Sequence, residues 1–565
     1  MTTGHDHTLD LSASAEEDKT LLIRQALGAL PPNEAAVLRI PPGTWHFWPD
    51  RAAERHYFIS NNDCGLKRIV FPLVNSRHLT IDGQGAEFIF HGHVTPFVLD
   101  GASHVTLRDL TIDYDRPFFT QGEIINAGPE HVDLCIDREN YPCRVENGRL
   151  VFSGPTWDGA GFQWVMLLVQ FDPATRMLAS NRGYHIGRFL SLAHIDPTHD
   201  SWAMKLEASE NADGTVRLTA AWGDGMEPGN MLVLGHEHRL DPAVLVTDSA
   251  DVRLENITIH HAGAMGVIAQ LSRDITLDGV QIALRPGTDR MVSTLADATH
   301  FVNCEGTVAL ENCVFENMLD DGTNIHGIYT TVSHVLAPDT LELELMHFQQ
   351  HGIQLYRPGD TVTFVNRETL LPIQTAVVRN ARLVNRERIE VTFTEPVEDS
   401  VAVGDAVDNT TRFPEIIIRG CRTGHNRPRG VLLSSHRKTV VEDNTFYNSS
   451  SGVTIAGDAN YWFEAGPVGD LTIRCNRFLS CGYADGAPAI VIAPEIPGAN
   501  DDTPCYHRNI TIEQNEFQTD GRPVVFARSV DGLRMVNNTY AEGCPTAPAE
   551  RVKLDHCREV QLEEG

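Results

Sequence analysis

The sequence predicts an all-β protein whose main body is a right-handed parallel β-helix. A short unit recurs along the chain, in which alternating apolar residues lead to Asn, Asp or Gly before a second short strand begins. The unit returns with a nearly constant period, for example 23 residues from Asn256 to Gly279 and 24 residues from Gly420 to Asn444. Such a unit cannot bury its apolar face alone, so successive copies must stack as coils.

One amphipathic helix is predicted ahead of the first coil. The run Ser14-Ala-Glu-Glu17 resembles a capping box, and apolar residues follow at helical spacing from Leu22 to Leu30 until Pro31-Pro32. A helix at this place would cover the open end of the solenoid, since terminal repeats need a polar outer face.

Two stretches interrupt the coil period. The first contains the hairpin signals Asn147-Gly148 and Asp213-Gly214, flanked by alternating strands. The second begins near Val335 and ends near Asn409. We therefore expect two small antiparallel β-barrel modules inserted into loops of the β-helix. The predicted segments are 1–117 (helical cap and first coils), 118–245 (module 1), 246–334 (central coils), 335–411 (module 2) and 412–565 (C-terminal coils).

Composition excludes several classes of partner. The formal net charge of −31 disfavours nucleic acid, because the chain repels phosphate backbones. No apolar run approaches the ~20 residues that cross a bilayer, so no membrane partner is expected. Eleven cysteines without a Cys-x-x-Cys pair fit reduced thiols better than disulfides or a zinc site. The first residues have no signal-peptide pattern, which predicts a cytoplasmic protein or a trimmed secreted form.

Three carboxylates carry the candidate chemistry. Asp297 precedes Asp320 by 23 residues and Asp321 by 24, which places them on adjacent coils ~4.8 Å apart. Neighbouring carboxylates shift each other's pKa, so that one can act as an acid and the other as a base, as glycoside hydrolysis requires. Asp320-Asp321-Gly322 is also a common turn signal. His300 and other polar residues nearby favour a site over a solvated turn.

The segments 263–270, 296–301, 319–327, 427–430 and 461–466 together resemble glycoside hydrolase family 110, the α-1,3-galactosidases. The Leu-Asp-Asp…Asn-x-His-Gly run from Leu319 to Gly327 is the most specific of them. The resemblance implies an inverting exo-glycosidase that removes terminal α-1,3-linked galactose from blood-group B-type or related glycans. It implies that Asp297, Asp320 and Asp321 carry catalysis, without saying which is the acid and which the base. For an inverting pair, carboxyl groups ~6.5–9.5 Å apart are expected.

Further residues are candidates for binding the sugar, each with a structural alternative. They are Gln270, His300, Asn324, His326, Arg429, Trp462 and Glu464. Trp462 could stack on galactose or simply pack, and Arg429 could bind hydroxyls or form a structural ion pair. Each histidine could orient an aspartate, contact the sugar or satisfy an internal hydrogen bond.

Neither a cofactor nor a metal is expected, and the partner is a galactose-terminated oligosaccharide. The sequence leaves open whether the protein forms a homodimer. Two other functions also stay open: a pectinase- or lyase-like β-helix enzyme on another polysaccharide, and a β-helix that binds glycans without catalysis, because fold alone does not fix function.

Overall fold

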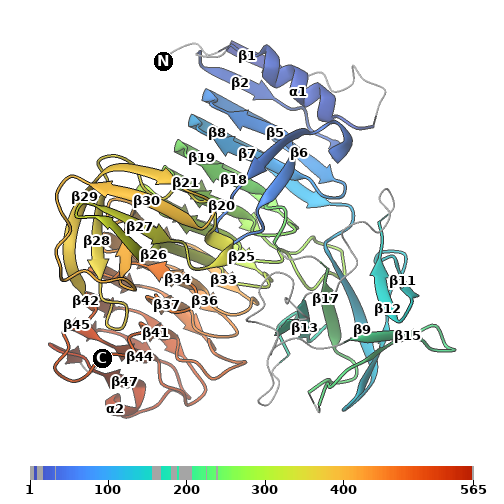
Figure 1. The fold of residues 1–565 in the computed structure, drawn as a ribbon. Coiled ribbons are helices and arrows are strands. Elements are labelled where there is room, and N and C mark those ends of the chain that lie inside the picture. The colour runs from blue at the N-terminus through green and yellow to red at the C-terminus, as the bar shows by residue number, and fades with distance from the viewer. Residues whose placement is uncertain are drawn as a thin grey trace.

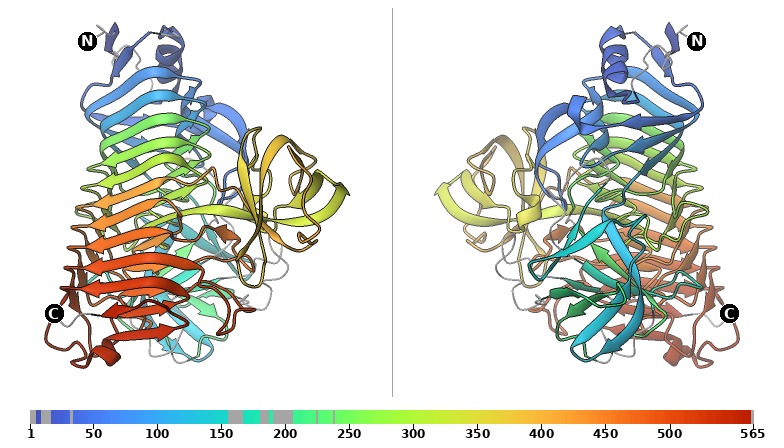
Figure 2. Two further views of the ribbon diagram at one scale, coloured as in Figure 1. Left: turned by 90° about the vertical axis from the view of Figure 1, so that its left-hand side faces the viewer. Right: turned by 90° about the vertical axis from the view of Figure 1, so that its right-hand side faces the viewer.

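The computed structural model describes residues 5–8, 17–31, 34–154, 167–179, 187–189, 206–223, 225–236 and 239–562. Its body is a stack of parallel coils that runs from the N-terminal to the C-terminal end of the chain (Figure 1). Figure 2 shows the coils stacked along one axis, with a yellow β-module projecting from the stack. No helix among these described residues is long and apolar enough to cross a bilayer.

The coils form three ladders of parallel strands. The first ladder comprises β1 (His5–Thr8), β2 (Ala36–Arg39), β6 (Arg77–Phe90), β8 (Ser103–Tyr114), β19 (Ala250–Ile259), β21 (Arg273–Asp278), β24 (Glu305–Glu311), β32 (Glu415–Arg419), β35 (Lys438–Glu442), β39 (Asp470–Arg474), β42 (His507–Glu513), β45 (Val530–Val536) and β48 (Gln561–Leu562). The second ladder adds to the far halves of β6, β8 and β19 the strands β3 (Thr44–Phe47), β22 (Gln281–Ile282), β25 (Val314–Glu316), β33 (Arg422–Gly424), β36 (Thr445–Tyr447), β40 (Arg477–Leu479), β43 (Glu516–Gln518) and β46 (Thr539–Tyr540).

The third ladder carries the candidate site. It comprises β5 (Gly65–Val74), β7 (Thr95–Asp100), β18 (Val244–Thr247), β20 (Val267–Gln270), β23 (Thr299–Val302), β26 (Thr323–Ala337), β34 (Val431–Leu433), β37 (Val453–Ile455), β41 (Ile490–Ile492), β44 (Val525–Arg528) and β47 (Val552–Asp555). Two antiparallel strands flank this ladder: β4 (Ala53–Tyr57) pairs with β5, and β38 (Glu464–Ala465) pairs with β26.

The corners between the first two ladders explain the repeated Asn, Asp and Gly. Asp109, Asn256 and Gly279 all have φ between 51° and 66°, a left-handed conformation that these residue types tolerate best. In the C-terminal coils, Asn444 donates to Asn476 at 2.9 Å, and Asn476 donates to the next asparagine at 3.0 Å. The repeat therefore places an internal asparagine ladder beside the apolar core.

The helix α1 (Thr20–Ala29) lies at the N-terminal end of the stack, where it buries Ile23 (Figure 1). The predicted capping box does not begin this helix. The helix begins at Thr20, and its N-cap residue, Lys19, makes no side-chain cap hydrogen bond. Asp18 accepts a hydrogen bond from the Thr20 backbone N–H just before the helix, while Ser14 lies outside the described residues. The other short helices are α2 (Pro548–Arg551), η2 (Pro49–Arg51) and η4 (Phe348–Gln350).

Module 1 is an antiparallel sheet in the order β14-β13-β17-β9-β10-β16-β15. Its strands are β9 (Phe119–Gly128), β10 (His131–Cys135), β13 (Leu167–Phe171), β14 (Gly187–Phe189), β15 (Glu207–Glu210), β16 (Val216–Thr219) and β17 (Met231–Gly235), with the separate hairpin β11 (Cys143–Glu146) and β12 (Arg149–Phe152). Asn147 and Gly148 both have positive φ in the turn of that hairpin, as the sequence predicts.

Module 2 is a closed antiparallel barrel in which β26 pairs with both β27 and β31. The remaining strands close the ring in the order β27, β30, β29, β28 and β31. Their bounds are β27 (Thr340–Glu344), β28 (Thr361–Val365), β29 (Pro372–Leu383), β30 (Arg388–Phe393) and β31 (Ala406–Asp408). The predicted fold class, a parallel β-helix with a helical cap and two inserted antiparallel modules, is confirmed. The five segment boundaries stay predictions.

Candidate active site

The β-helix register aligns the candidate residues in one column across three coils. Asp297 lies two residues before β23, Asp321 two residues before β26, and Arg429 two residues before β34. The strands pair in register, so the residues that precede them also stack. The Ala298 N–H donates to the carbonyl of Asp321 at 2.9 Å, and the Gly322 N–H donates to that of Arg429 at 3.0 Å. The spacing of 24 residues thus places Asp297 and Asp321 on adjacent coils.

Asp320 joins this pair because the chain bends before β26. One carboxylate oxygen from each of Asp297, Asp320 and Asp321 lies within 4.8 Å of the other two. Gly322 is required by close packing rather than by its φ, since a Cβ there would lie 2.4 Å from the Gly430 carbonyl oxygen. The Asp320 side chain is 16% exposed, against 3% for Asp297 and 2% for Asp321, so Asp320 is the carboxylate most open to solvent.

Arginines compensate the charge of two aspartates. Arg429 donates Nε and Nη2 to the two oxygens of Asp321, each at 2.8 Å, and Arg239 forms an ion pair with Asp320. Arg427 donates Nε to the Leu319 carbonyl at 3.3 Å. The bidentate pair fixes Asp321 in one orientation.

Asp297 is bonded to a pair of histidines instead. Its Oδ2 lies 2.5 Å from His300 Nδ1, and His300 Nε2 lies 2.9 Å from His326 Nε2. His326 Nδ1 lies 2.6 Å from the carbonyl oxygen of Gly327. All three side chains are almost completely buried. The histidines therefore contact the aspartate and each other, in the orienting role that the sequence left open.

Burial moves the titration of Asp297 and Asp321 toward neutral pH and keeps His300 neutral. Burial, together with the charge of Asp320, raises the pKa of Asp297 to about 8, although Arg239 and Arg429 oppose the rise. Burial raises the pKa of Asp321 to about 7 against the opposing effect of Arg429. Burial and the neighbouring His326 hold the pKa of His300 well below its usual value. Carboxyl groups that titrate near neutrality suit acid and base catalysis.

Glu464 lies at the edge of this cluster on β38. It accepts hydrogen bonds from Asn324 at 3.3 Å and from Asn61 at 3.4 Å, and its Oε1 lies 3.5 Å from His326 Nε2. Trp462, two residues earlier, is 41% exposed. Its ring centroid lies 4.9 Å from that of His347 and 5.1 Å from that of Tyr461, so the indole belongs to a partly exposed aromatic group close in sequence to Glu464.

Gln270 is occupied by internal hydrogen bonds. Its amide oxygen accepts from the Ser60 N–H at 2.9 Å, and its amide nitrogen donates to the Phe58 carbonyl at 2.9 Å and to Thr247 at 3.2 Å. This side chain anchors the segment between β4 and β5, which also supplies Asn61. Gln270 therefore holds Asn61, a hydrogen-bond partner of Glu464, in place rather than presenting free polar groups to a sugar.

The three aspartate oxygens lie close enough together to hold a metal ion. Two of the three carboxylates are already paired with guanidinium groups, which compensate the charge that would attract a cation. We therefore assign no metal to this cluster.

Comparison with known proteins identifies the lineage. Residues 120–232 match the family model described as GLAA-B beta-barrel domain I, and residues 340–407 match GLAA-B beta-barrel domain II. The chain is 36% identical over 532 residues to "Alpha-1,3-galactosidase A" of Shewanella woodyi, covering 94% of this chain and 84% of that protein. It is 32% identical over 553 residues to "Alpha-1,3-galactosidase B" of Bacteroides thetaiotaomicron, covering 96% of this chain and 87% of that protein. The chain belongs to the α-1,3-galactosidase family, glycoside hydrolase family 110.

The chain also has a distant likeness to a solved structure of another protein. The endo-xylogalacturonan hydrolase of Aspergillus tubingensis aligns with 97% of this chain and 95% of that protein, at 9% identity and a TM-score of 0.43. A likeness at this level carries no statement about activity.

In this member of glycoside hydrolase family 110, one oxygen from each aspartate lies within 4.8 Å of one oxygen from each of the other two. This distance joins single oxygens, whereas the expected ~6.5–9.5 Å of an inverting pair is the separation of the carboxyl groups, so the splayed pair stays a prediction.

The sequence did not point to Asn61 and Arg239. Asn61 lies between β4 and β5, and Arg239 lies between β17 and β18, so both reach the site from segments outside the coil period. Neither stands at a repeat spacing from an aspartate, so the coil period does not indicate them. Both nevertheless contact site carboxylates, Glu464 and Asp320 respectively.

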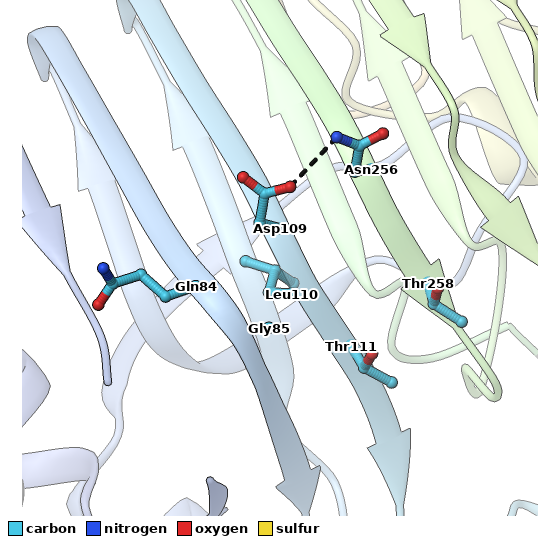
Figure 3. A pocket seen from close by; sticks show the side chains of 7 residues that line it. All are labelled: Gln84, Gly85, Asp109, Leu110, Thr111, Asn256 and Thr258. Atoms are coloured by element: carbon cyan, nitrogen blue, oxygen red, sulfur yellow. Dashed lines mark hydrogen bonds between the residues drawn. The ribbon is translucent and has the colours of Figure 1, made fainter. Parts of the chain in front are cut away.

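A separate hollow of about 350 Å³ lies on strands β6, β8 and β19 (Figure 3). Asp109 and Asn256 point toward each other across it and share a hydrogen bond of 3.1 Å. Its lining contains one carboxylate and none of the candidate site residues, so it offers no acid and base pair.

Proposed function

We propose that this protein is an exo-acting α-1,3-galactosidase that hydrolyses terminal α-1,3-linked galactose from blood-group B-type or related glycans. The observation that carries the proposal is the convergence of Asp297, Asp320 and Asp321 within 4.8 Å, in a chain of this family. The names of the A and B relatives supply the linkage and the sugar. They favour a galactosidase over a pectinase-like enzyme or a non-catalytic glycan-binding β-helix.

The binding residues have distinct proposed roles. Glu464, oriented by Asn324 and Asn61, accepts hydrogen bonds from sugar hydroxyls, and Trp462 stacks on an apolar sugar face. Arg429 acts mainly through Asp321, with one third of its side chain exposed toward solvent. His300 and His326 are buried and act through Asp297, while Gln270 acts through the segment that holds Asn61.

The test is to incubate the protein with linear Gal-α-1,3-Gal and with the branched B trisaccharide in parallel, and to measure free galactose. Release from either substrate supports the proposal, and the ratio of the two rates defines the specificity. Release from neither, by a protein with a cooperative thermal transition, would refute it. Gal-α-1,4-Gal is the matched control, on which we expect no activity.

Substitution of the aspartates tests the site. Asp297→Asn, Asp320→Asn and Asp321→Asn should each keep the melting temperature within a few degrees, and at least two should lose more than ~10²-fold in kcat, the usual scale of an acid or base contribution. Near-wild-type turnover by all three would mean that the cluster is only a turn. Size-exclusion chromatography with light scattering would test whether the protein forms the homodimer that the sequence leaves open.

A further inference from the structure

The Gly327 carbonyl fixes the donor and the acceptor of each hydrogen bond between Asp297 and Gly327. The Gly327 carbonyl can only accept, so His326 Nδ1 carries a hydrogen and donates it. In a neutral His326 the Nε2 then has a lone pair, so the facing His300 Nε2 must donate its hydrogen. A neutral His300 consequently presents a lone pair at Nδ1, and the hydrogen of the 2.5 Å bond belongs to Asp297 Oδ2.

Burial agrees with a protonated Asp297. It is the largest influence on the pKa of Asp297, which it raises, and on the pKa of His300, which it lowers, so it favours the neutral form of both groups. The charged groups around Asp297 and the two imidazoles are Arg239, Arg427, Arg429, Asp320, Asp321 and Glu464. Of these, Asp320 and Glu464 raise the pKa of Asp297 further, whereas Arg239 and Arg429 lower it.

We propose that His300 and His326 form a proton relay that makes Asp297 the acceptor of the proton from the attacking water. The inference rests on the proposed function. The hydrogen on Oδ2 points at His300 and is not presented to the substrate, so Asp297 in this state is not the proton donor to the leaving oxygen. Its other oxygen, Oδ1, has no hydrogen-bond partner among the described residues and is free to accept.

The proton transfers balance along this chain. As the water oxygen bonds to the anomeric carbon, a water proton moves to Asp297 Oδ1 and the Oδ2 proton moves to His300 Nδ1. The His300 Nε2 proton moves to His326 Nε2, which becomes an imidazolium 3.5 Å from the Glu464 carboxylate. The electron pair of the broken glycosidic bond leaves with the departing oxygen, which takes a proton from the carboxylic acid form of Asp320, the aspartate most open to solvent, while Asp321 stays ionised against Arg429. Glu464 stabilises the charge that the relay deposits at His326.

The experiment uses azide, a nucleophile that does not have to lose a proton. Asp297→Asn, His300→Gln and His326→Gln are assayed with α-galactosyl fluoride, whose leaving group needs little acid assistance. We expect each variant to lose more than ~10²-fold in kcat with KM within ~3-fold, the scale of a lost base contribution. Added azide should restore turnover of all three at least ~10-fold and yield galactosyl azide. His104→Gln, which breaks an exposed His–Asp pair elsewhere, should behave as wild type with or without azide.

Two results would overturn the relay. One is fluoride turnover within ~3-fold of wild type in His326→Gln, since a glutamine cannot take up the proton. The other is a loss of turnover, in variants that keep the wild-type melting temperature, that azide does not relieve. The wild-type protein separates failure of the relay from failure of the proposed function. If the wild type releases no galactose from the α-1,3-linked substrates, the function itself is refuted; if it releases galactose, these results concern the relay alone. If His300→Gln does not fold, His326→Gln alone decides.

Discussion

Arg429 holds the buried Asp321 through two parallel hydrogen bonds of 2.8 Å, and the Arg429 backbone N–H donates to the same carboxylate at 3.1 Å. Three donors on one carboxylate favour its ionised form, whereas burial disfavours it. The pKa of Asp321, raised to about 7, reflects this balance. The arginine therefore keeps Asp321 ionisable in the physiological range.

Arg429→Met should shift the pH dependence of this protein. Without the guanidinium, the pKa of Asp321 rises further, so the acidic limb of the kcat/KM profile should move to higher pH by about one unit or more. Activity at pH 6 should then fall at least ~10-fold. The activity of Arg429→Lys at pH 6 should lie between those of the wild type and Arg429→Met, because lysine keeps the charge without the bidentate geometry. The control is Arg437→Met, which replaces an exposed arginine between β34 and β35. An acidic limb at the same pH as in the wild type would show that Arg429 does not set the pKa of Asp321.

Asp297→Asn should change how stability depends on pH. The folded-state pKa of Asp297, about 8, exceeds its ordinary value of 3.8, so the folded protein binds more protons than the unfolded chain between these values. By linkage, this group contributes stability that is complete below about pH 4 and is lost as pH rises toward 8, at up to ~1.4 kcal/mol per pH unit. An asparagine cannot ionise, and its amide can donate to His300 as the protonated acid does.

The measurement is urea unfolding of wild type and Asp297→Asn at pH 5 and pH 8. We expect the free energy of unfolding of the wild type to fall more over this interval than that of the variant. Equal falls in the two proteins would show that Asp297 is ionised at pH 5.

The column of Asp297 and Asp321 was predictable because one period governs the coils, and a residue two positions before each strand recurs at one place on the stack. Arg239 and Asn61 were not predictable, because their approach depends on how module 1 and the β4–β5 segment pack against the coils. The separation of the acid and base carboxyl groups was not predictable for a related reason. Sequence spacing places the coils but does not fix the direction in which the bend at Asp320 sends its side chain.

Trp462→Ala should weaken substrate binding with little effect on chemistry. The side chain is 41% exposed and its ring contacts are with His347 and Tyr461, so its removal leaves the hydrogen bonds of Asp297, Asp320 and Asp321 in place. We expect KM to rise about 5- to 20-fold, from ~1–2 kcal/mol of lost contact, with kcat within ~3-fold. Steady-state kinetics check this, with Leu554→Ala, at a similarly exposed position in the last coils, as control. A fall in kcat at unchanged KM would place Trp462 in the transition state rather than in binding.

Deletion of residues 335–409 tests how module 2 is attached. A module confined to one loop would leave the coils foldable. The structure instead places Leu271, Val302 and Ile328 of the coil strands and their loops in one apolar cluster with Leu343 and Phe364 of the barrel. Each apolar side chain that the deletion exposes should cost ~1.5–3 kcal/mol. We therefore expect the shortened protein to melt at least ~10 °C lower or to be insoluble. An unchanged thermal transition would show that the barrel folds separately.

The stereochemistry of hydrolysis is the last prediction, and the geometry makes it a sharp one. One oxygen of each aspartate lies within 4.8 Å of one oxygen of each of the others, and the separation of the carboxyl groups is ~5–5.5 Å in a retaining pair and ~6.5–9.5 Å in an inverting one. A retaining enzyme needs a carboxylate free to attack carbon, yet Asp321 is bound through both oxygens by Arg429, Asp320 pairs with Arg239, and Asp297 is protonated toward His300. Water held by the cluster is then the nucleophile, and inversion, which fits the family, is expected. Proton NMR in the first minutes should show β-galactose before mutarotation. If α-galactose appears first, one aspartate is a nucleophile and the relay through Asp297 does not activate the water that attacks the substrate.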